Sequence, residues 1–430
     1  MKKVVIIGGG FAGVNAAKVL GGKEVDVTLI DRRNHHLFQP LLYQVAMAGL
    51  SPADIAAPIR GMLAPYRNIR VLLGEVHSVD LKNRKVLTDC SETGCDELPY
   101  DYLIMACGAQ HAYFGHEEWE EHAPGLKTLE QATEIRRRVL SAFEAAEKET
   151  DPERQKKLLT FIVIGGGATG VELAGAIGEM SRFTLARDFR NIDPAMSRVI
   201  LIEAGSRILS AFAESLSQRA ARDLEHLGVE VWTSKMVTMV DAGGVMLGDE
   251  KVLAATILWG AGVQASSLGK ELGAELDRQG RVKVLPDLSL KEYPEVFVVG
   301  DQANFPAENG EPLPGLAPVA LQQGRCSAGN ILRDIEGHPR QAYRYFDKGH
   351  MATIGRSKAI GEVRKIRFSG FTAWLAWLLV HIYYLTGFRN RLFVVLQWGW
   401  SYLTFSRGAR LIMSRDWHSY HPRSAPDDKD

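Results

Sequence analysis

One short motif occurs twice in the chain, and this repeat constrains the fold more than any other feature. VVIIGGGFAG begins at Val4 and FIVIGGGATG begins at Phe161. In each copy an apolar run typical of a buried strand precedes GxGxxG, and small residues at helical spacing follow it. A strand, a glycine turn and a helix in this order open a βαβ unit. The sequence therefore predicts an α/β fold with two doubly wound dinucleotide-binding domains.

Each glycine of the motif has its own role in holding a dinucleotide. The first makes a tight turn, the second lets a pyrophosphate approach the backbone, and the third lets the helix pack close to the strand. An acid at the end of the next strand accepts hydrogen bonds from ribose hydroxyls. GxGxxG alone also fits ordinary turns, but the strand, helix and acid around both copies favour two sites. Their residues are Gly8, Gly10, Gly13 and Asp31 in the first, and Gly165, Gly167, Gly170 and Glu203 in the second.

Two such sites predict two different dinucleotides, one of them a redox centre. A nicotinamide delivers a hydride, and a flavin accepts it and passes the electrons on. If the second site holds the nicotinamide, the charge of Glu203 disfavours a 2′-phosphate and favours NADH, whereas the nearby Arg207 favours NADPH. A segment around FTLARDFRNIDP lengthens the spacing between the second glycine motif and Glu203.

Composition excludes several classes of protein. A length of 430 residues allows two or three domains, and 51 basic against 51 acidic residues give no sign of a nucleic-acid partner. The four cysteines form no CxxC pair and no cluster with histidine, so no metal site is expected. The glycine loop follows the N-terminus too closely for a signal peptide, so secretion is not expected.

Further elements are expected along the chain. Strands are predicted at 25–31, around Val71 and Val86, and at 100–106, 161–165, 198–204, 229–233, 255–262 and 296–304. A charged helix is predicted over 133–149, and its charged residues are expected to form a solvent-exposed face without a further role. The polar residues 150–157 are predicted to cross between domains.

Five stretches together resemble type II NADH:quinone oxidoreductases, the non-pumping, single-subunit respiratory NADH dehydrogenases. They are the two glycine motifs, NHHLFQPLLYQVA (34–46), LWGAGV (258–263) and VFVVGDQAN (296–304). The whole superfamily of flavoproteins with two dinucleotide domains shares the glycine motifs. FQPLLYQVA and the C-terminal region are more specific and favour the type II enzymes within this superfamily. The resemblance implies bound FAD, NADH as substrate, a membrane quinone as acceptor, and a peripheral homodimer on the cytoplasmic face of the cell membrane.

The resemblance also implies a domain order, in which an NADH-binding domain is inserted into the FAD-binding domain. The FAD-binding domain would comprise 1–118 and 286–345, and the NADH-binding domain 119–285. Residues 346–430 would supply part of the quinone site and a membrane anchor.

Site residues follow from the resemblance position by position. Those implied for FAD are Gly8, Gly10, Phe11, Ala12, Gly13, Asp31, Arg32, Gln39, Pro40, Leu41, Leu42, Val76, Ala106, Cys107, Gly108, Gly300 and Asp301. Those implied for NADH are Gly165, Gly167, Ala168, Thr169, Gly170, Glu203 and Gly262. The quinone motif AQxAxQ aligns with Ala317, Pro318 and Val319 and the residues after them, with Pro318 in place of the first glutamine. Glu172, Gln322, Gln323 and Lys348 are the candidate catalytic residues.

Each catalytic candidate also has an ordinary structural explanation. Glu172 in the first helical turn would compensate the helix dipole. Gln322 and Gln323 precede a predicted helix and would be surface or capping residues, and Lys348 would be a surface lysine. Cys107 is expected to be an inert, small buried residue.

The C-terminal region combines basic and aromatic residues. No acid occurs from 363 to 415, where Arg364, Lys365, Arg367, Arg389, Arg391, Arg407, Arg410 and Arg415 alternate with tryptophan and tyrosine. This pattern suits a lipid headgroup region, and each cation near such a surface contributes about 1 kcal/mol. Two amphipathic helices lying in one leaflet are preferred over a transmembrane hairpin or a soluble dimer interface, and the continuous aliphatics argue against a nucleic-acid surface.

Other functions remain open on the sequence alone. Sulfide:quinone oxidoreductases use paired cysteines beside the flavin, which this sequence does not offer. Soluble ferredoxin or rubredoxin reductases lack the basic, aromatic tail. A membrane-attached NADH-binding sensor would bind the same cofactors without rapid turnover.

Overall fold

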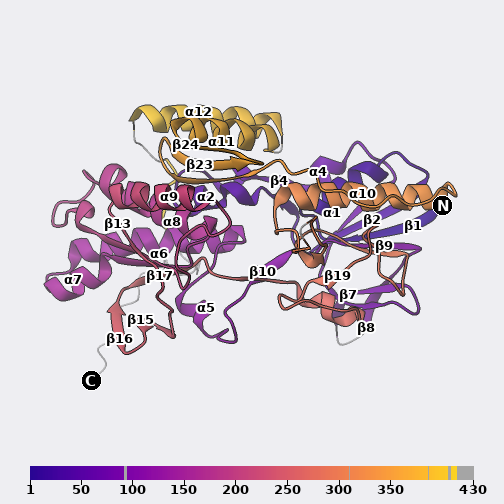
Figure 1. Cartoon of the computed structure of the whole chain (residues 1–430), viewed down its shortest axis with the longest axis horizontal. Helices are drawn as coiled ribbons and strands as arrows, with labels where there is room; N and C mark the ends of the chain where they lie inside the picture. Colours follow the sequence, from indigo (N-terminus) through magenta and orange to yellow (C-terminus); the bar gives the residue numbers. More distant parts are fainter. Residues whose placement is uncertain (92–93, 309, 386, 405–407, 414–430) are drawn as a thin grey trace, which may run out of the picture.

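Two parallel β-sheets, one in each half of the molecule, form the framework. The structure is a computed structural model that describes residues 1–430 except 92–93, 309, 386, 405–407 and 414–430 (Figure 1). The first sheet has the order β20-β9-β1-β2-β5, with β20 at Val296–Val298, β9 at Tyr102–Met105, β1 at Lys2–Ile7, β2 at Val25–Asp31 and β5 at Ile69–Leu73. The second has the order β13-β12-β11-β17, with β13 at Val229–Trp232, β12 at Arg198–Ile202, β11 at Thr160–Ile164 and β17 at Thr256–Trp259. The predicted doubly wound α/β architecture is confirmed.

Both sheets place the glycine motif in the same way. β1 lies between β9 and β2, and β11 lies between β17 and β12, with all pairings parallel. In each sheet the strand before the glycines therefore runs beside the strand that ends at the acidic residue. The carboxyl ends of the central strands and the following helices α1 (Phe11–Leu20) and α8 (Ala168–Glu179) meet at one edge of each sheet, where this fold binds ligands.

Smaller elements surround the two parallel sheets. The small antiparallel sheets comprise β3 (His35–Leu37) with β4 (Ala56–Pro58), β6 (Val76–Asp80) with β7 (Lys85–Ser91) and β8 (Gly94–Pro99), and β14 (Met239–Asp241) with β15 (Gly244–Leu247) and β16 (Glu250–Leu253). A short parallel pair joins β19 (Val282–Lys283) to β21 (Ala303–Asn304). Further helices are α2 (Leu42–Ala46), α3 (Pro52–Ile55), α4 (Ile59–Leu63), α5 (Trp119–His122) and α9 (Glu214–His226).

A two-stranded ribbon carries the chain between the halves. β10 (Ala109–His111) pairs antiparallel with β18 (Val263–Ala265), and Figure 1 shows β10 in the middle of the molecule. The prediction of a crossing at 150–157 is wrong. Pro152–Leu158 form helix α7, which Asp151 caps by accepting a hydrogen bond from the Arg154 N–H, and β11 follows within the same half.

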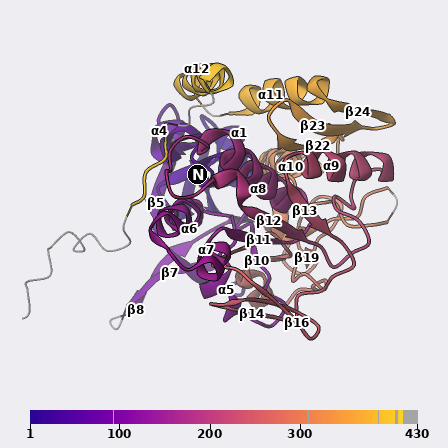
Figure 2. The same ribbon diagram turned by 90° about the vertical axis from the view of Figure 1, so that its left-hand side faces the viewer.

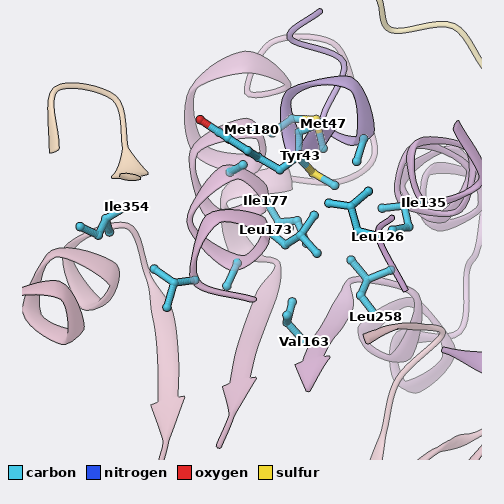
Figure 3. Packing of buried hydrophobic residues seen from close by; sticks show 14 of the residues in the cluster. Tyr43, Met47, Leu126, Ile135, Val163, Leu173, Ile177, Met180, Leu258 and Ile354 are labelled. Atoms are coloured by element: carbon cyan, nitrogen blue, oxygen red, sulfur yellow. The ribbon is translucent and has the colours of Figure 1, made fainter. Parts of the chain in front are cut away.

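The predicted helix over 133–149 begins earlier than expected and has a buried face. It is α6 (Leu129–Lys148), and Thr128 caps it by accepting the Gln131 N–H. Ile135 and Phe143 belong to the large hydrophobic cluster shown in part in Figure 3. The charged pattern of this helix gave no sign that one of its cations is buried, yet Arg136 is only 3 % exposed.

Arg136 connects three segments. Its Nε donates to the Val45 carbonyl at 2.8 Å, and its two other nitrogens donate to the carbonyls of Leu50, at 2.9 Å, and Ala409, at 3.0 Å. The end of α2 and the C-terminal chain are thus joined to α6. Burial lowers the pKa of Arg136, and the carbonyl oxygens compensate the buried charge.

The C-terminal region forms a layer of its own. β22 (His350–Gly355), β23 (Lys358–Val363) and β24 (Ile366–Gly370) form an antiparallel sheet. Helices α11 (Phe371–Tyr384) and α12 (Phe388–Thr404) lie beside it on the outer surface of the molecule (Figures 1 and 2). Among the described residues, no helix is both long enough and apolar enough to cross a bilayer.

Gly175 lets α8 approach this C-terminal layer closely. A Cβ placed on Gly175 would lie 1.8 Å from the carbonyl oxygen of Ile354 in β22. We expect Gly175→Ala to lower the free energy of unfolding by about 3 kcal/mol, because backbone must move to admit the methyl group. Urea denaturation measures the loss.

A matched control lies in α10 (Ala317–Ile335), where a Cβ on Gly329 would meet nothing within 4 Å. Gly329→Ala should raise the free energy of unfolding by about 0.5–1 kcal/mol, since alanine favours the helix. Equal effects of the two substitutions would contradict the close packing at Gly175.

Candidate active site

The first glycine motif is built as a dinucleotide cradle. Gly8 has φ of +102°, and a Cβ on Gly13 would lie 1.8 Å from the Gly8 carbonyl oxygen. A Cβ on Gly10, in contrast, would meet nothing within 4 Å. Two glycines are therefore required by the protein itself, whereas Gly10 leaves open space beside the backbone. Asp31 fixes the loop, because its Oδ2 accepts the Gly9 N–H at 2.6 Å.

The second motif reproduces this geometry. Gly165 has φ of +105°, a Cβ on Gly170 would lie 1.8 Å from the Gly165 carbonyl oxygen, and a Cβ on Gly167 would meet nothing within 4 Å. Glu203 Oε2 accepts the Gly166 N–H at 2.6 Å. The inserted segment that lengthens the spacing includes a π-helical turn and ends before β12, so it leaves the acid in the same position as in the first motif.

In the structure, the Arg207 guanidinium is hydrogen-bonded to backbone carbonyls rather than to Glu203. It donates to the carbonyls of Ser210 and Phe212, both at 2.9 Å. Glu203 Oε1 accepts the Gly205 N–H at 2.7 Å, so this carboxylate is held at the end of the second sheet.

Residues predicted around the flavin come from several segments. Gln39, Pro40 and Leu41 form a 3-10 turn before α2, where Leu41 and Leu42 are buried. Phe11, Ala12 and Arg32 flank the first cradle and Val76 begins β6, whereas Ala168 and Thr169, which are predicted for NADH, begin α8. The Ala106 carbonyl oxygen would lie 2.3 Å from a Cβ on Gly8, and Gly108 has φ of +69°.

The cysteines give no reactive thiolate beside the flavin segment. Burial raises the pKa of Cys107 to about 12 and that of Cys326 to about 11. At neutral pH both thiols keep their protons, and a thiol is a weak nucleophile. Cys90 and Cys95 lie outside the described side chains.

The predicted strand at 296–304 ends early, and this change of direction positions Asp301. β20 ends at Val298, and Gly300, with φ of +73°, begins a 3-10 turn to Gln302. The amide oxygen of Gln323 accepts the Gly300 N–H at 2.7 Å, and Gln323 is 1 % exposed. Gln323 is thus a positioning residue for this turn.

Both halves contribute to a cavity of about 220 Å³. Thr169 and Gly262 line it from the second half, and Asp301 lines it from the first. Lys127, which the sequence reasoning missed, lies with its Nζ 3.9 Å from Asp301 Oδ2. Residues predicted for two different cofactors therefore face one space.

A second cavity, of about 100 Å³, contains Glu172. Tyr43 of α2 and Thr353 of β22 line it, as do Trp377 of α11 and Trp398 of α12. Burial raises the pKa of Glu172 to about 8, and the Thr353 N–H, which donates to the carboxyl, opposes this shift. A carboxyl with this pKa holds and releases a proton near neutral pH.

A hydrogen-bonded chain joins this cavity to α12. Trp398 Nε1 donates to Gln44 Oε1 at 3.3 Å, and Gln44 Nε2 donates to the Tyr43 hydroxyl at 2.8 Å. Tyr43 lies between α2 and α8 in Figure 3. These contacts could not be predicted from the sequence, although Tyr43 and Gln44 belong to the FQPLLYQVA stretch.

The other catalytic candidates lie apart from Glu172. The Gln322 side chain pairs with the backbone of Phe346, donating to its carbonyl at 3.1 Å and accepting its N–H at 3.0 Å. Lys348 Nζ donates to the Tyr384 hydroxyl of α11 at 2.6 Å. None of Gln322, Gln323 and Lys348 lines the cavity of Glu172.

Two sequence predictions need correction at this point. Glu172 does not lie in the first turn of its helix, because the first turn of α8 contains no acid. Gln322 and Gln323 do not precede a helix, because α10 begins at Ala317. Pro318 stands in the first turn, where a helix needs no backbone donor, so the residue that departs from the family motif suits the start of this helix. Val319 is buried behind it.

α11 passes over the regions of Glu172 and Lys348. Trp377, His381 and Tyr384 are spaced as one helical face. Trp377 lines the cavity, His381 packs edge-on against Phe38 at 6.2 Å between ring centroids, and Tyr384 receives Lys348. His381 Nδ1 bonds to the Trp377 carbonyl at 2.6 Å.

Comparisons with known proteins agree with this geometry. The pyridine nucleotide-disulphide oxidoreductase family matches residues 2–324. The chain is 46% identical over 422 residues to the type II NADH:quinone oxidoreductase Ndh of Mycobacterium tuberculosis, covering 95% of this chain and 90% of that protein. It is 30% identical to the type II NADH:quinone oxidoreductase of Staphylococcus aureus, covering 84% of this chain and 90% of that protein.

Solved structures share the fold. NDH2 from Plasmodium falciparum in complex with NADH has a TM-score of 0.86 at 19% identity, covering 96% of this chain and 100% of that chain. The sulfide:quinone oxidoreductase of Aquifex aeolicus has a TM-score of 0.73 at 21% identity, covering 91% and 92%. The duplicated cradles and the sequence relatives together establish that the chain belongs to the type II NADH:quinone oxidoreductase family.

Proposed function

We propose that this protein oxidises NADH and reduces a membrane quinone, NADH + H⁺ + quinone → NAD⁺ + quinol, without pumping ions. The observation that carries the proposal is the pair of equivalent cradles, together with a cavity that Thr169 of the second cradle and Asp301 of the first half both line. Both cradles leave open space at the glycine where a pyrophosphate would approach the backbone, Gly10 and Gly167. Family membership supports the same reaction.

The first cradle fits FAD. Open space at Gly10 admits a pyrophosphate, and Asp31 has lone pairs left for a ribose after accepting the Gly9 N–H. FAD, when bound, supplies the two-electron chemistry that links NADH to quinone. The residues Gln39 to Leu42 and Asp301 would orient it, and Gln323 would hold the Asp301 turn in place.

The second cradle favours NADH over NADPH. Glu203 presents a negative charge where NADPH would carry its 2′-phosphate, and Arg207 is turned to backbone carbonyls. Two carbonyl partners keep this cation from serving as a phosphate ligand. We therefore propose NADH as the substrate.

Glu172 is proposed to give a proton to the quinone. Its raised pKa leaves the carboxyl protonated at neutral pH, so it is ready to donate. Lys348, with its ammonium on the Tyr384 hydroxyl under α11, is proposed to help orient the quinone head group. Gln322 is proposed to act indirectly, by fixing the segment at Phe346 that precedes Lys348.

A spectroscopic experiment tests the function. The purified protein should be yellow, anaerobic NADH should bleach the flavin absorbance, and a short-chain quinone should restore it. A protein that stays colourless when supplied with FAD would refute the proposal. Bleaching without reoxidation by quinone would instead indicate a sensor.

α11 and α12 are proposed to attach the enzyme to the membrane. Their outer surface exposes Phe371, Leu375, Leu379, Val380, Tyr383, Leu392, Phe393, Val395, Leu396 and Trp400. Trp377, Leu385 and Val394 are buried on the inner side. An apolar surface of this size on one side of the molecule suits an interface with lipid, with both helices lying in one leaflet.

The double substitution Leu379→Glu with Leu396→Glu should abolish binding to anionic vesicles. Burying one leucine contributes about 1.5–3 kcal/mol, so each change should weaken binding by about tenfold or more. Vesicle flotation measures the loss. Leu253→Glu is the control, since Leu253 is similarly exposed (56 %) but lies in β16, outside the C-terminal layer. Normal flotation of the double variant would contradict the proposal.

The remaining organisation is also proposed from the family resemblance. We propose an FAD-binding domain of 1–118 and 286–345, an NADH-binding domain of 119–285 and a C-terminal region of 346–430. The β10–β18 ribbon supports an inserted domain, since it passes the chain out and back. We further propose a homodimer at the cytoplasmic face, where NADH is available, and sedimentation of the detergent-purified protein tests the dimer.

A further inference from the structure

The cavity of Glu172 follows helix α8 toward a second acid. Glu172, Ala176 and Glu179 all line it. Spacings of four and three residues place them on one face of the helix, and seven residues span about 10 Å. Glu179 is the last residue of α8, and both acids are half-buried, so the cavity leads from Glu172 to an acid at the end of the α-helical segment.

One strand and its turn support both acids. The Thr353 N–H donates to Glu172, and the Arg356 N–H donates to Glu179 Oε2 at 3.0 Å. β22 and the turn after it thus hold both carboxyls along the same wall. A cavity of about 100 Å³ has room for about three water molecules at their liquid volume.

The remaining lining does not exchange protons near neutral pH. Tyr43, Trp374, Trp377 and Trp398 form the aromatic part of the lining. Burial, with the nearby charge of Glu172, raises the pKa of Tyr43 far above its usual range, so its phenol keeps its proton. An arginine guanidinium stays charged in proteins. Glu172 and Glu179 are therefore the two groups of this lining that could relay a proton to the quinone.

We propose that this cavity is the proton uptake route of the enzyme, with Glu179 taking a proton from solvent and passing it through water to Glu172. The inference rests on the proposed function, because it requires Glu172 to protonate the quinone. The hydride of NADH brings one hydrogen of the quinol, and solvent supplies the other. Glu172 gives its proton to the reduced quinone oxygen, and a proton that Glu179 takes up from solvent then crosses through water to the Glu172 carboxylate.

Infrared spectroscopy tests the route without turnover. The C=O band that Glu172→Gln removes identifies the protonated carboxyl of Glu172. On transfer of the full-length protein to D₂O, we expect Glu179→Gln to slow the deuterium shift of this band by about tenfold, because the amide cannot relay a proton. Glu179→Asp should restore exchange, and Glu225→Gln, at an exposed glutamate of α9, should not alter it.

Stopped-flow kinetics give an independent measurement. Glu179→Gln should slow the quinone-dependent step by about tenfold and leave bleaching of the flavin by NADH unchanged. A structural role would slow both steps and would not be rescued by aspartate. Wild-type exchange and kinetics in Glu179→Gln would overturn the uptake route.

The two proposals fail in different ways. Normal quinone kinetics in Glu172→Gln would overturn both the donor role of Glu172 and the route. A slow Glu172→Gln enzyme beside a normal Glu179→Gln enzyme would overturn the route alone.

Discussion

A Gly167→Ala variant is expected to fold normally, keep its flavin and lose most of its affinity for NADH. The new methyl group meets no atom of the protein within 4 Å, so it leaves the apoprotein undisturbed. It occupies the space that a pyrophosphate needs. We expect NADH binding to weaken by about 100-fold, the equivalent of about 3 kcal/mol of steric overlap. Titration of flavin bleaching with NADH measures the change.

The first cradle offers the reciprocal experiment. In Gly10→Ala the methyl group is equally free of protein contacts. This variant should fold but be purified without colour, since FAD is the ligand that the methyl group excludes. If Gly10→Ala affected only NADH and Gly167→Ala affected only FAD, the assignment of the two cradles would have to be reversed.

Gly170→Ala separates damage to the ligand site from damage to the fold. Its Cβ would lie 1.8 Å from the Gly165 carbonyl oxygen, so the backbone of the second cradle must move. We expect a lower urea midpoint for Gly170→Ala and an unchanged one for Gly167→Ala. Similar urea midpoints for the two variants would contradict the distinction between a packing glycine and a ligand-facing glycine.

The parts of the fold that could be predicted are those that the local sequence determines. An apolar, β-branched run before a glycine motif specifies a buried parallel strand and the turn after it. The glycine turns and the acids beside them, Asp31 and Glu203, were therefore predictable, even across the inserted segment. Strand ends were less accurate: the strand predicted at 255–262 is β17 at Thr256–Trp259, because glycines beyond it take the chain into the ribbon.

Contacts between distant segments could not be predicted. Arg136 looks like one charge among many in a solvated helix, yet it is buried against carbonyls of residues 45, 50 and 409. Nothing within α6 specifies those partners. In the same way, the surroundings of Glu172 come from α2, β22, α11 and α12. A raised pKa is a property of that assembled environment. The sequence therefore indicated Glu172 as a candidate catalytic residue but could not predict its protonation state.

Glu172→Gln should slow quinone reduction by about 100-fold, since an amide cannot donate the proton. In the wild-type enzyme, quinone reduction should decline as the pH rises through about 8, because Glu172 then loses its proton. The variant should lack this decline. The other charged residues lining the cavity are Glu179 and Arg356, and both are retained in Glu172→Gln. Stopped-flow reoxidation of the flavin by quinone, measured against pH, tests the prediction, and an unchanged rate would remove Glu172 from the reaction.

The same shift predicts a change in stability that does not depend on turnover. The folded protein keeps the Glu172 proton up to a pH of about 8, whereas the unfolded chain loses it near the ordinary value of 4.5. Between these values the folded state binds the extra proton, so rising pH lowers the unfolding free energy by about 1.4 kcal/mol per pH unit from this group. Glutamine does not titrate. The stability of Glu172→Gln relative to wild type should therefore increase from about pH 5 to about pH 8 and then level off, as followed by urea denaturation. A constant difference would mean that the carboxyl is already ionised in the folded protein, and the donor role would then lose its physical basis.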